Sequence, residues 1–263
     1  MKGTIPKVIH YCWFGGNELP ELALKCIESW KKYCPEYEIK EWNEFNFDIN
    51  CCDYVREAYD AKRWAFVSVY ARFKILYEYG GIYFDTDVEL IRSIEDIVVK
   101  NGFMGIENED YEVNPGLGVG MPPKHALIFE LLTGYHDRHF IDENGNCDLK
   151  TVVKYTTEIL KKYGLSKAKE IQQCEGVYIY PKEYFCPLDY ETGKLNITEN
   201  TRTIHHYKAS WHSEMESYAM KLRRKMNRLL PRKVASVMAF GIAKIKFDGW
   251  KAFFLYVIRK IRR

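Results

Sequence analysis

Apolar and polar residues follow one another along the chain in the pattern of a protein that alternates strands with helices. Residues 8–14 (VIHYCWF) form a continuous apolar run that ends at Gly15-Gly16, as expected of a strand buried on both faces. Residues 20–33 follow with apolar positions at helical spacing, and the alternating stretch 37–42 predicts a second strand. Strand, helix and strand joined by such short connections indicate an open α/β sheet.

Residues 62–79 predict a long helix, and Gly80-Gly81 supply its C-terminal stop. Residues 82–90 (IYFDTDVEL) are rich in apolar and β-branched residues and predict the strand that follows. The same reasoning predicts strands at 103–107, 117–121, 177–181 and 203–207 and helices at 125–139 and 148–163.

Charge is distributed unevenly along the 263 residues. The whole chain has 39 Lys+Arg and 36 Asp+Glu, a net charge of +3, and 47% of it is hydrophobic, which excludes a disordered chain. Residues 213–263 hold 14 Lys/Arg and 3 Asp/Glu, a net of +11, so residues 1–212 hold 25 and 33, a net of −8. We therefore predict a folded domain over 1–212 and a basic tail over 213–263, with helix-compatible stretches at 217–230 and 240–263.

Cysteine usage and apolar runs suggest a compartment. None of the eight cysteines forms a CxxC pair, which argues against zinc knuckles and redox dithiols. The N-terminal apolar run is too short for a signal peptide, and no stretch reaches 18 apolar residues. We expect a cytoplasmic protein with free thiols.

Asp85 and Asp87 are the first candidates for chemistry. Two positions apart on the predicted strand, their carboxylates would share one side, where the strand leaves the core. Ligands of open α/β sheets bind beyond the carboxyl ends of strands, and two hard oxygen donors suit Mg²⁺ or Mn²⁺ on a diphosphate. The alternative is a strand-end turn with solvated acids, because Asp-x-Asp arises by chance in about half of chains this long.

The residues around the two acids narrow the interpretation. From Arg72 the chain reads Arg72-x6-YGGIYFDTD, and it also contains IPKVIHYCWFGG, CIESWKKYCPEYEI, YPKEYFCP and HHYKASW. In this order the segments resemble the DXD-containing glycosyltransferases of family 32, of the capsular-polysaccharide type, over roughly residues 4–212. That family is related to yeast mannosyltransferases and more distantly to the large clostridial glucosylating toxins.

The resemblance implies a GT-A fold, in which a Rossmann-like, mostly parallel sheet is flanked by helices. It implies metal-assisted transfer of a hexose, with retention, from a nucleotide-sugar, UDP- rather than GDP-linked, using Mn²⁺ or Mg²⁺. The implied acceptor is a glycan, typically lipid-linked, in capsular or other surface polysaccharide synthesis. A front-face attack fits this family, while Glu107 and Glu175 stay open as covalent nucleophiles.

Four residues near the first strands take roles from the resemblance. Trp13 matches the aromatic residue that stacks on the nucleotide base, although a core tryptophan would look the same. Asp87 matches the direct metal ligand, and Asp85 matches the acid that contacts ribose or the metal's outer shell. Arg72 matches an arginine on donor sugar or phosphate; the alternative is a salt bridge to either acid.

The late motif supplies further matches. His205 and His206 match the histidine that closes the metal site, with His206 the better match, and a structural histidine is the alternative. Imidazole beside two carboxylates would favour Mn²⁺. Ser210 and Trp211 match residues that contact the pyrophosphate.

Two internal residues match less specifically. Asn114 matches a donor- or acceptor-facing amide, and Glu175 matches an acceptor-side acid. Either residue could instead serve a turn.

Val69 departs from the family pattern, which reads Ser-Asp-x-x-Arg where this chain has Ser68-Val69-Tyr70-Ala71-Arg72. The family's Asp binds hydroxyls of the donor sugar, and valine accepts no hydrogen bond. The donor could lack that hydroxyl, a neighbouring acid could substitute, or the chain could be an impaired nucleotide-sugar-binding relative or engineered variant.

The basic tail has two interpretations. Trp250, Phe253, Phe254 and Tyr256 among Lys and Arg indicate an anchor at an anionic membrane surface, which would make the protein peripheral. The other is a solvated helical cap. The acidic body and the lack of a nucleic-acid module argue against a nucleic-acid partner.

Overall fold

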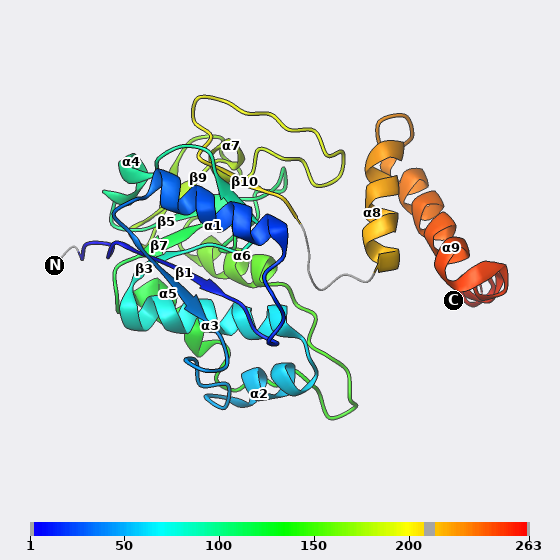
Figure 1. The fold of residues 1–263 in the computed structure, drawn as a ribbon, viewed down its shortest axis with the longest axis horizontal. Coiled ribbons are helices and arrows are strands. Elements are labelled where there is room, and N and C mark those ends of the chain that lie inside the picture. Colours follow the sequence, from blue (N-terminus) through cyan, green and yellow to red (C-terminus); the bar gives the residue numbers. More distant parts are fainter. Residues whose placement is uncertain (1–2, 208–213, 262–263) are drawn as a thin grey trace. The chain divides into compact units, whose positions relative to one another are not determined.

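The computed structural model describes residues 3–207 and 214–261, with the side chains of all but 252 and 256–261. The chain forms two compact units (Figure 1). Unit 1 comprises residues 1–187 and 196–206, and unit 2 comprises residues 188–195 and 207–263. Ser210 and Trp211, predicted to contact a pyrophosphate, lie outside the described residues.

Unit 1 is built on an eight-stranded sheet with the order β2-β1-β3-β7-β5-β9-β8, in which β6 pairs with β5. Pairing directions show that β1, β2, β3, β5 and β9 run one way and β6, β7 and β8 run the other. The predicted α/β fold, a mostly parallel sheet flanked by helices, is confirmed. The strands are β1 (Val8–Cys12), β2 (Glu38–Trp42), β3 (Gly81–Tyr83), β5 (Phe103–Ile106), β6 (Val113–Asn114), β7 (Val119–Met121), β8 (Gln172–Cys174) and β9 (Val177–Tyr180).

Helices cover both faces of this sheet, with α1 on one side and α3 and α5 on the other (Figure 1). The long helix predicted over 62–79 is α3, which buries residues on most of its circumference and ends where Gly80 takes a φ of 66°. The helices of unit 1 are α1 (Glu21–Tyr33), α2 (Asp53–Asp60), α3 (Trp64–Tyr79), α4 (Glu95–Val98), α5 (Ala126–Thr133), α6 (Val152–Lys162) and α7 (Lys182–Phe185).

The single strand predicted over 82–90 is wrong. The chain leaves the large sheet after β3 and then forms β4 (Val88–Leu90), which pairs with β10 (Thr203–His205) in a separate two-stranded sheet. The residues between β3 and β4 make a turn in which the Val88 N–H donates to the Asp85 carbonyl at 3.0 Å. Asp85 and Asp87 therefore lie on a turn, and the argument that strand alternation places both on one side fails.

Unit 2 contains α8 (Glu214–Met226) and α9 (Arg232–Ile261), which starts directly after Pro231 and is interrupted at Gly249, where φ is 82°. The loop 188–195 packs on α8, because Arg224 Nε donates to the Tyr190 carbonyl at 2.9 Å. No helix in the described part of the chain is long and apolar enough to cross a bilayer.

Candidate active site at the carboxyl edge of the sheet

The turn that carries Asp85 and Asp87 lies at the carboxyl ends of the parallel strands. The backbone of Asp85, the first of the two acids, is held by the loop after β6, because the Asp85 N–H donates to the Gly116 carbonyl at 3.0 Å. The side chain of Asp85 is 30% exposed and that of Asp87 is 16% exposed. Both acids are thus held at the edge where open α/β sheets bind ligands.

Arg72 reaches this turn from the middle of α3. Its Nη2 donates to Asp85 Oδ1 at 2.6 Å, and its guanidinium lies 4.7 Å from the centre of the Tyr83 ring. Burial lowers the pKa of Arg72, but Asp85, Tyr83 and Cys12 together raise it above its ordinary value, so the side chain is a cation. Its Nε and Nη1 are buried and make no hydrogen bond within the described residues. Two donors of a buried cation are therefore left over after the ion pair with Asp85.

A glycine brings the loop after β6 against Asp85. A Cβ on Gly116 would lie 2.0 Å from Asp85 Oδ2, so only glycine fits this close approach. The Gly116 N–H donates to Asn114 Oδ1 at 2.7 Å, and Asn114 Nδ2 donates to Glu107 Oε1 at 3.0 Å. The predicted site residue Asn114 is buried here and links Glu107 to the loop beside Asp85.

His205, the last residue of β10, faces Asp87. Its Nε2 lies 3.3 Å from Asp87 Oδ1, and its Nδ1 lies 4.0 Å from Glu107 Oε1. Burial lowers the pKa of His205, but the charge and hydrogen bond of Asp87, with a smaller contribution from Cys186, raise it well above its ordinary value. Burial also raises the pKa of Glu107, against the effects of His205 and Asn114. These groups share one buried, charge-coupled cluster.

His206 has different partners from His205. Its N–H donates to the Asp87 carbonyl at 3.0 Å, while its Nε2 lies 2.8 Å from Glu89 Oε2. Lys25 also contacts Glu89, at 3.0 Å. The sequence favoured His206 as the metal-site histidine, whereas in the structure His205 is the one whose ring faces Asp87. Successive residues of an extended segment point to opposite sides, so a shift of one position exchanges these roles.

Trp13 follows β1 at the same edge of the sheet. Its Nε1 donates to the Asn17 carbonyl at 2.6 Å, and it is half-buried rather than part of the core. The next turn is held by Glu44, whose Oε1 accepts from the Gly15 N–H at 2.7 Å. A Cβ on Gly15 would lie 2.6 Å from the Trp64 indole, so the turn packs tightly on α3.

Glu175 lies apart from the other predicted residues. It is exposed in the turn between β8 and β9, with a φ of 46°. This turn precedes β9, which is parallel to β5, so it lies at the amino edge of the sheet, opposite Asp85. The structure thus brings together Arg72, Asp85, Asp87, Asn114 and His205, and does not bring Glu175 to them.

Sequence reasoning missed the parts of Gly116, Glu44 and Tyr83 in this site. Gly116 leaves the space that Asp85 occupies, and Glu44 accepts a hydrogen bond from Gly15, 29 residues away. The ring of Tyr83 packs against the Arg72 guanidinium. The only sequence indication was the Asn-Pro-Gly turn that contains Gly116.

The donor types at this edge suit a divalent cation. Carboxylates of Asp85 and Asp87 with the His205 imidazole form the oxygen and nitrogen set that Mn²⁺ or Mg²⁺ accepts. One oxygen of Asp85 is engaged by Arg72, which leaves Asp87 and His205 as the better-placed pair. Across residues 3–207 and 214–261, no three His, Cys, Asp or Glu side chains form a ready-made metal cluster.

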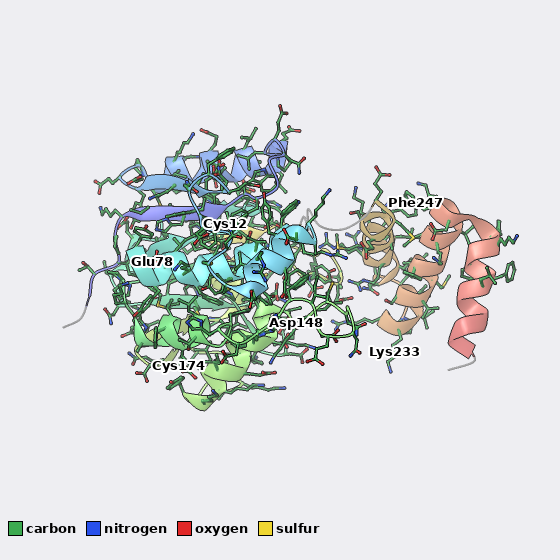
Figure 2. The ribbon with its side chains drawn as sticks, turned by 90° about the horizontal axis from the view of Figure 1, so that it is seen from below. Cys12, Glu78, Asp148, Cys174, Lys233 and Phe247 are labelled. Carbon is green, nitrogen blue, oxygen red and sulfur yellow. The ribbon has the colours of Figure 1, made fainter. Side chains whose placement is uncertain are left out.

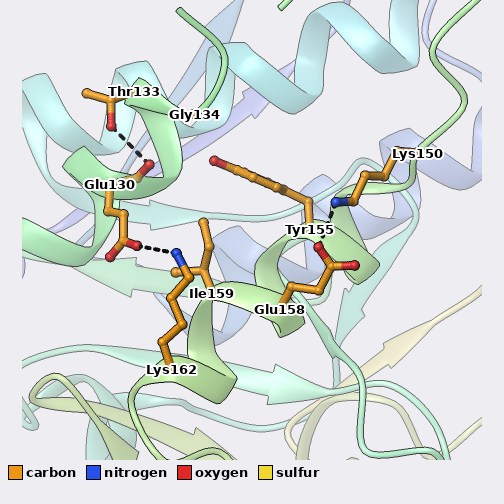
Figure 3. A pocket seen from close by; sticks show the side chains of 8 residues that line it. All are labelled: Glu130, Thr133, Gly134, Lys150, Tyr155, Glu158, Ile159 and Lys162. Atoms are coloured by element: carbon orange, nitrogen blue, oxygen red, sulfur yellow. Dashed lines mark hydrogen bonds and ion pairs between the residues drawn. The ribbon is translucent and has the colours of Figure 1, made fainter.

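A surface pocket between α5 and α6 is separate from this site (Figure 3). Two ion pairs lie in it, Lys162 with Glu130 at 3.2 Å and Lys150 with Glu158 at 2.6 Å. None of the predicted site residues lines this pocket.

A family model and a curated relative each match part of the chain. Residues 20–104, which include Arg72, Asp85 and Asp87, match the glycosyltransferase sugar-binding region containing a DXD motif. The chain is 33% identical over 99 residues to inositol phosphoceramide mannosyltransferase 3 of Schizosaccharomyces pombe, a match that covers 36% of this chain and 28% of that protein. The chain thus matches less than a third of this relative's length.

A solved structure, the PaToxG glycosyltransferase, is similar at 16% identity with a TM-score of 0.45. The match covers 61% of this chain and 70% of that one.

Proposed function

We propose that this chain, whose residues 20–104 match the glycosyltransferase sugar-binding region containing a DXD motif, transfers a hexose from a nucleotide-sugar to a glycan acceptor. The observation that carries the proposal is the convergence of Arg72, Asp85, Asp87 and His205 at the carboxyl edge of the sheet. A buried cation and a pair of acids at such an edge form a site suited to a sugar diphosphate.

In this proposal Arg72 binds the donor. Its Nε and Nη1, which make no hydrogen bond within the described residues, would donate to donor phosphate or sugar oxygens. Its Nη2 stays on Asp85, which fixes the plane of the guanidinium. Trp13 would stack on the nucleobase from the end of β1, and Ser210 and Trp211 would contact the pyrophosphate.

Asp87 and His205 would hold Mn²⁺ or Mg²⁺, with Asp85 nearby or in its outer shell. When bound, such an ion neutralises charge on the leaving diphosphate as a Lewis acid. His206 would support this arrangement through its N–H on the Asp87 carbonyl. Binding of the cation would release the proton that Asp87 favours on His205.

We propose a retaining transfer with a UDP-sugar as the preferred donor. The acceptor hydroxyl would attack from the face of the leaving group and lose its proton to the departing phosphate oxygen. Glu107 would orient the site through Asn114 rather than act as a nucleophile, since its Oε1 accepts from Asn114 Nδ2. Glu175 would require an acceptor that extends around the sheet, because it lies at the opposite edge.

The acceptor would be a lipid-linked oligosaccharide used in capsular or other surface polysaccharide synthesis. Such an acceptor lies at a membrane, and the basic segment 213–263, with its net charge of +11, would bring the protein to the cytoplasmic face of an anionic one. The protein would then be peripheral and cytoplasmic.

A second candidate is a nucleotide-sugar-binding relative with impaired catalysis. Val69 favours it, because this half-buried residue packs against the core one turn before Arg72 and accepts no hydrogen bond. A site that lacks such an acceptor would bind the nucleotide but hold the sugar poorly.

The test is hydrolysis and thermal shift with UDP- and GDP-sugars, with and without Mn²⁺. Turnover that requires Mn²⁺ supports the transferase, and a thermal shift without turnover supports the impaired relative. Asp87→Asn should abolish both the Mn²⁺ shift and turnover, whereas the surface variant Asp110→Asn should change neither. Absence of any response to every donor would contradict both candidates.

A further inference from the structure

Unit 2 exposes apolar side chains that its own packing does not use. In α9 the buried contact is made by Ala235, Ala239 and Ala243, which follow one another at intervals of one turn. A second stripe of the same helix stays in solvent: Val234, Val237, Met238 and Ile242 are 45, 73, 44 and 38% exposed. Because the alanines already pack the helix, this second stripe is a surface rather than a core.

The segment after Gly249 exposes larger side chains. Trp250, Phe254 and Leu255 are 63, 57 and 53% exposed, and the Trp250 and Phe254 rings lie 6.2 Å apart. Phe253 packs inward instead, since a Cβ on Gly241 would lie 3.1 Å from its ring. The backbone break at Gly249 thus folds the segment back while leaving an aromatic pair in solvent.

Unit 2 also exposes many positively charged side chains. Exposed basic residues are found on α8, on the connection and on α9: Lys221, Lys225, Arg228, Arg232, Lys233, Lys246 and Lys251. Figure 2 labels Lys233 and Phe247, near the two ends of the α9 segment before Gly249. Exposed Trp and Phe among Lys and Arg is the composition of a helix that lies in a membrane interface.

We infer that unit 2 binds an anionic bilayer surface, with the two segments of α9, before and after Gly249, lying in the membrane plane. Trp250, Phe254 and the Val237–Met238 stripe would enter the boundary between headgroups and acyl chains, and the exposed lysines and arginines would contact lipid phosphates. The membrane binding rests on the proposed function and adds to it the residues that enter the bilayer and the mode of binding. Insertion would be shallow, because no helix among the residues that the structure describes is long and apolar enough to cross a bilayer.

The exposed apolar and basic side chains of unit 2 together favour a membrane over nucleic acid or a second copy of the chain. Nucleic acid would use the charges but leave Trp250, Phe254 and Leu255 in water. A second copy of the chain would cover the apolar residues but place like charges against each other. A bilayer containing anionic lipid satisfies both sets at once.

The experiment is co-sedimentation of the full chain with vesicles of phosphatidylcholine alone or mixed with phosphatidylglycerol. We expect binding to the mixed vesicles that high salt weakens, and about ten-fold weaker binding of Trp250→Glu/Phe254→Glu. Val99→Glu, which changes an 80% exposed apolar residue of unit 1, is the matched control and should bind like the unaltered chain.

Tryptophan fluorescence reports the insertion itself. The emission should shift to the blue with mixed vesicles, and Trp250→Phe should remove most of that shift while keeping the binding. Equal binding by Trp250→Glu/Phe254→Glu, equal binding to uncharged vesicles, a dimer without vesicles, or tighter binding to DNA would each overturn the inference. Hydrolysis of nucleotide-sugars without vesicles is measured separately, so failure of the transferase proposal remains distinguishable.

Discussion

Arg72 Nη2 and Asp85 Oδ1 are 2.6 Å apart and join the middle of α3 to the turn that follows β3. The pair leaves two nitrogens of Arg72, Nε and Nη1, without a hydrogen bond in the described residues, and it leaves Asp85 Oδ2 beside Gly116. One ion pair thus fixes the orientation of a buried guanidinium and of the acid next to it.

Replacing Arg72 should weaken donor binding. A charge-assisted hydrogen bond contributes about 1.5–3 kcal/mol, so Arg72→Gln should raise the Kd for a nucleotide-sugar about ten- to hundredfold. Arg72→Lys keeps the charge but loses the planar fork, so it should recover only part of the affinity. Calorimetric titration measures both, with Arg56→Gln as control because its pair with Asp53 lies on the surface. An unchanged Kd in Arg72→Gln would show that this residue only holds Asp85.

Gly116 should be intolerant of any side chain. The Cβ of Gly116→Ala would lie 2.0 Å from Asp85 Oδ2, so the carboxylate or the loop must move. Misplacement by about an ångström costs on the order of 100-fold in rate, and we expect that loss with the fold retained. Gly145→Ala is the control for backbone strain alone, because its Cβ meets nothing within 4 Å while its φ of 79° disfavours a side chain. It should keep activity, and circular dichroism checks folding in both variants. Full activity in Gly116→Ala would exclude Asp85 from the machinery.

Much of this fold follows from local sequence, as two cases show. The helix α3 could be predicted because apolar residues predominate from Trp64 to Tyr79 and the segment ends at Gly80, whose φ of 66° few other residues adopt. The α/β alternation likewise predicted the sheet. In contrast, residues 82–90 are rich in strand-favouring residues on both sides of Asp85-Thr86-Asp87, and nothing local indicates that β3 and β4 pair in different sheets.

In the site, too, the sequence indicates contacts between residues that are close along the chain but not contacts between distant ones. Arg72 and Asp85 lie 13 residues apart on a helix and the turn after the next strand, so sequence could propose their pairing. The choice between His205 and His206 depends on which side of one extended segment faces Asp87, and a one-residue register decides it. Glu44, 29 residues from Gly15, was missed because only folding brings them together.

Trp13 should contribute binding energy for the base alone. Stacking on an aromatic side chain contributes about 1–3 kcal/mol, so Trp13→Ala should weaken UDP binding by roughly five- to hundredfold. Trp13→Phe should keep most of that affinity, because a ring remains. Binding of UDP, measured without sugar or acceptor, isolates this contact. Trp250→Ala, in unit 2, should leave UDP affinity unchanged, and a weak Trp13→Ala effect would identify Trp13 as structural.

His10 should make the fold sensitive to acid. Its Nε2 lies 3.0 Å from the Gly80 carbonyl and its Nδ1 accepts from Trp42 Nε1 at 3.1 Å, an arrangement that requires neutral imidazole. Burial lowers the pKa of His10 to about 4, below the unfolded value of about 6.5. The unfolded chain therefore binds the proton first, and stability present above about pH 6.5 is lost as the pH falls towards 4.

The size of that loss is about 3 kcal/mol, measured by urea unfolding across this pH range. In His10→Gln the free energy of unfolding should fall less steeply with acid. His139→Gln is the control, because His139 is exposed and Glu57 raises its pKa, which gives the opposite sign. The same acid slope in His10→Gln and the unaltered chain would contradict the assignment.

Val69→Asp should show whether Val69 sets the preference for a particular donor sugar or impairs catalysis. The new carboxylate would lie one turn from Arg72 on α3 and compete with Asp85 for the guanidinium. For an active enzyme adapted to Val69, we expect turnover of its preferred donor to fall at least ten-fold and donors with an additional hydroxyl to gain. The donor panel measures this, and Val69→Asn separates hydrogen bonding from charge. A large gain with every donor would instead identify Val69 as a lesion and favour the impaired relative.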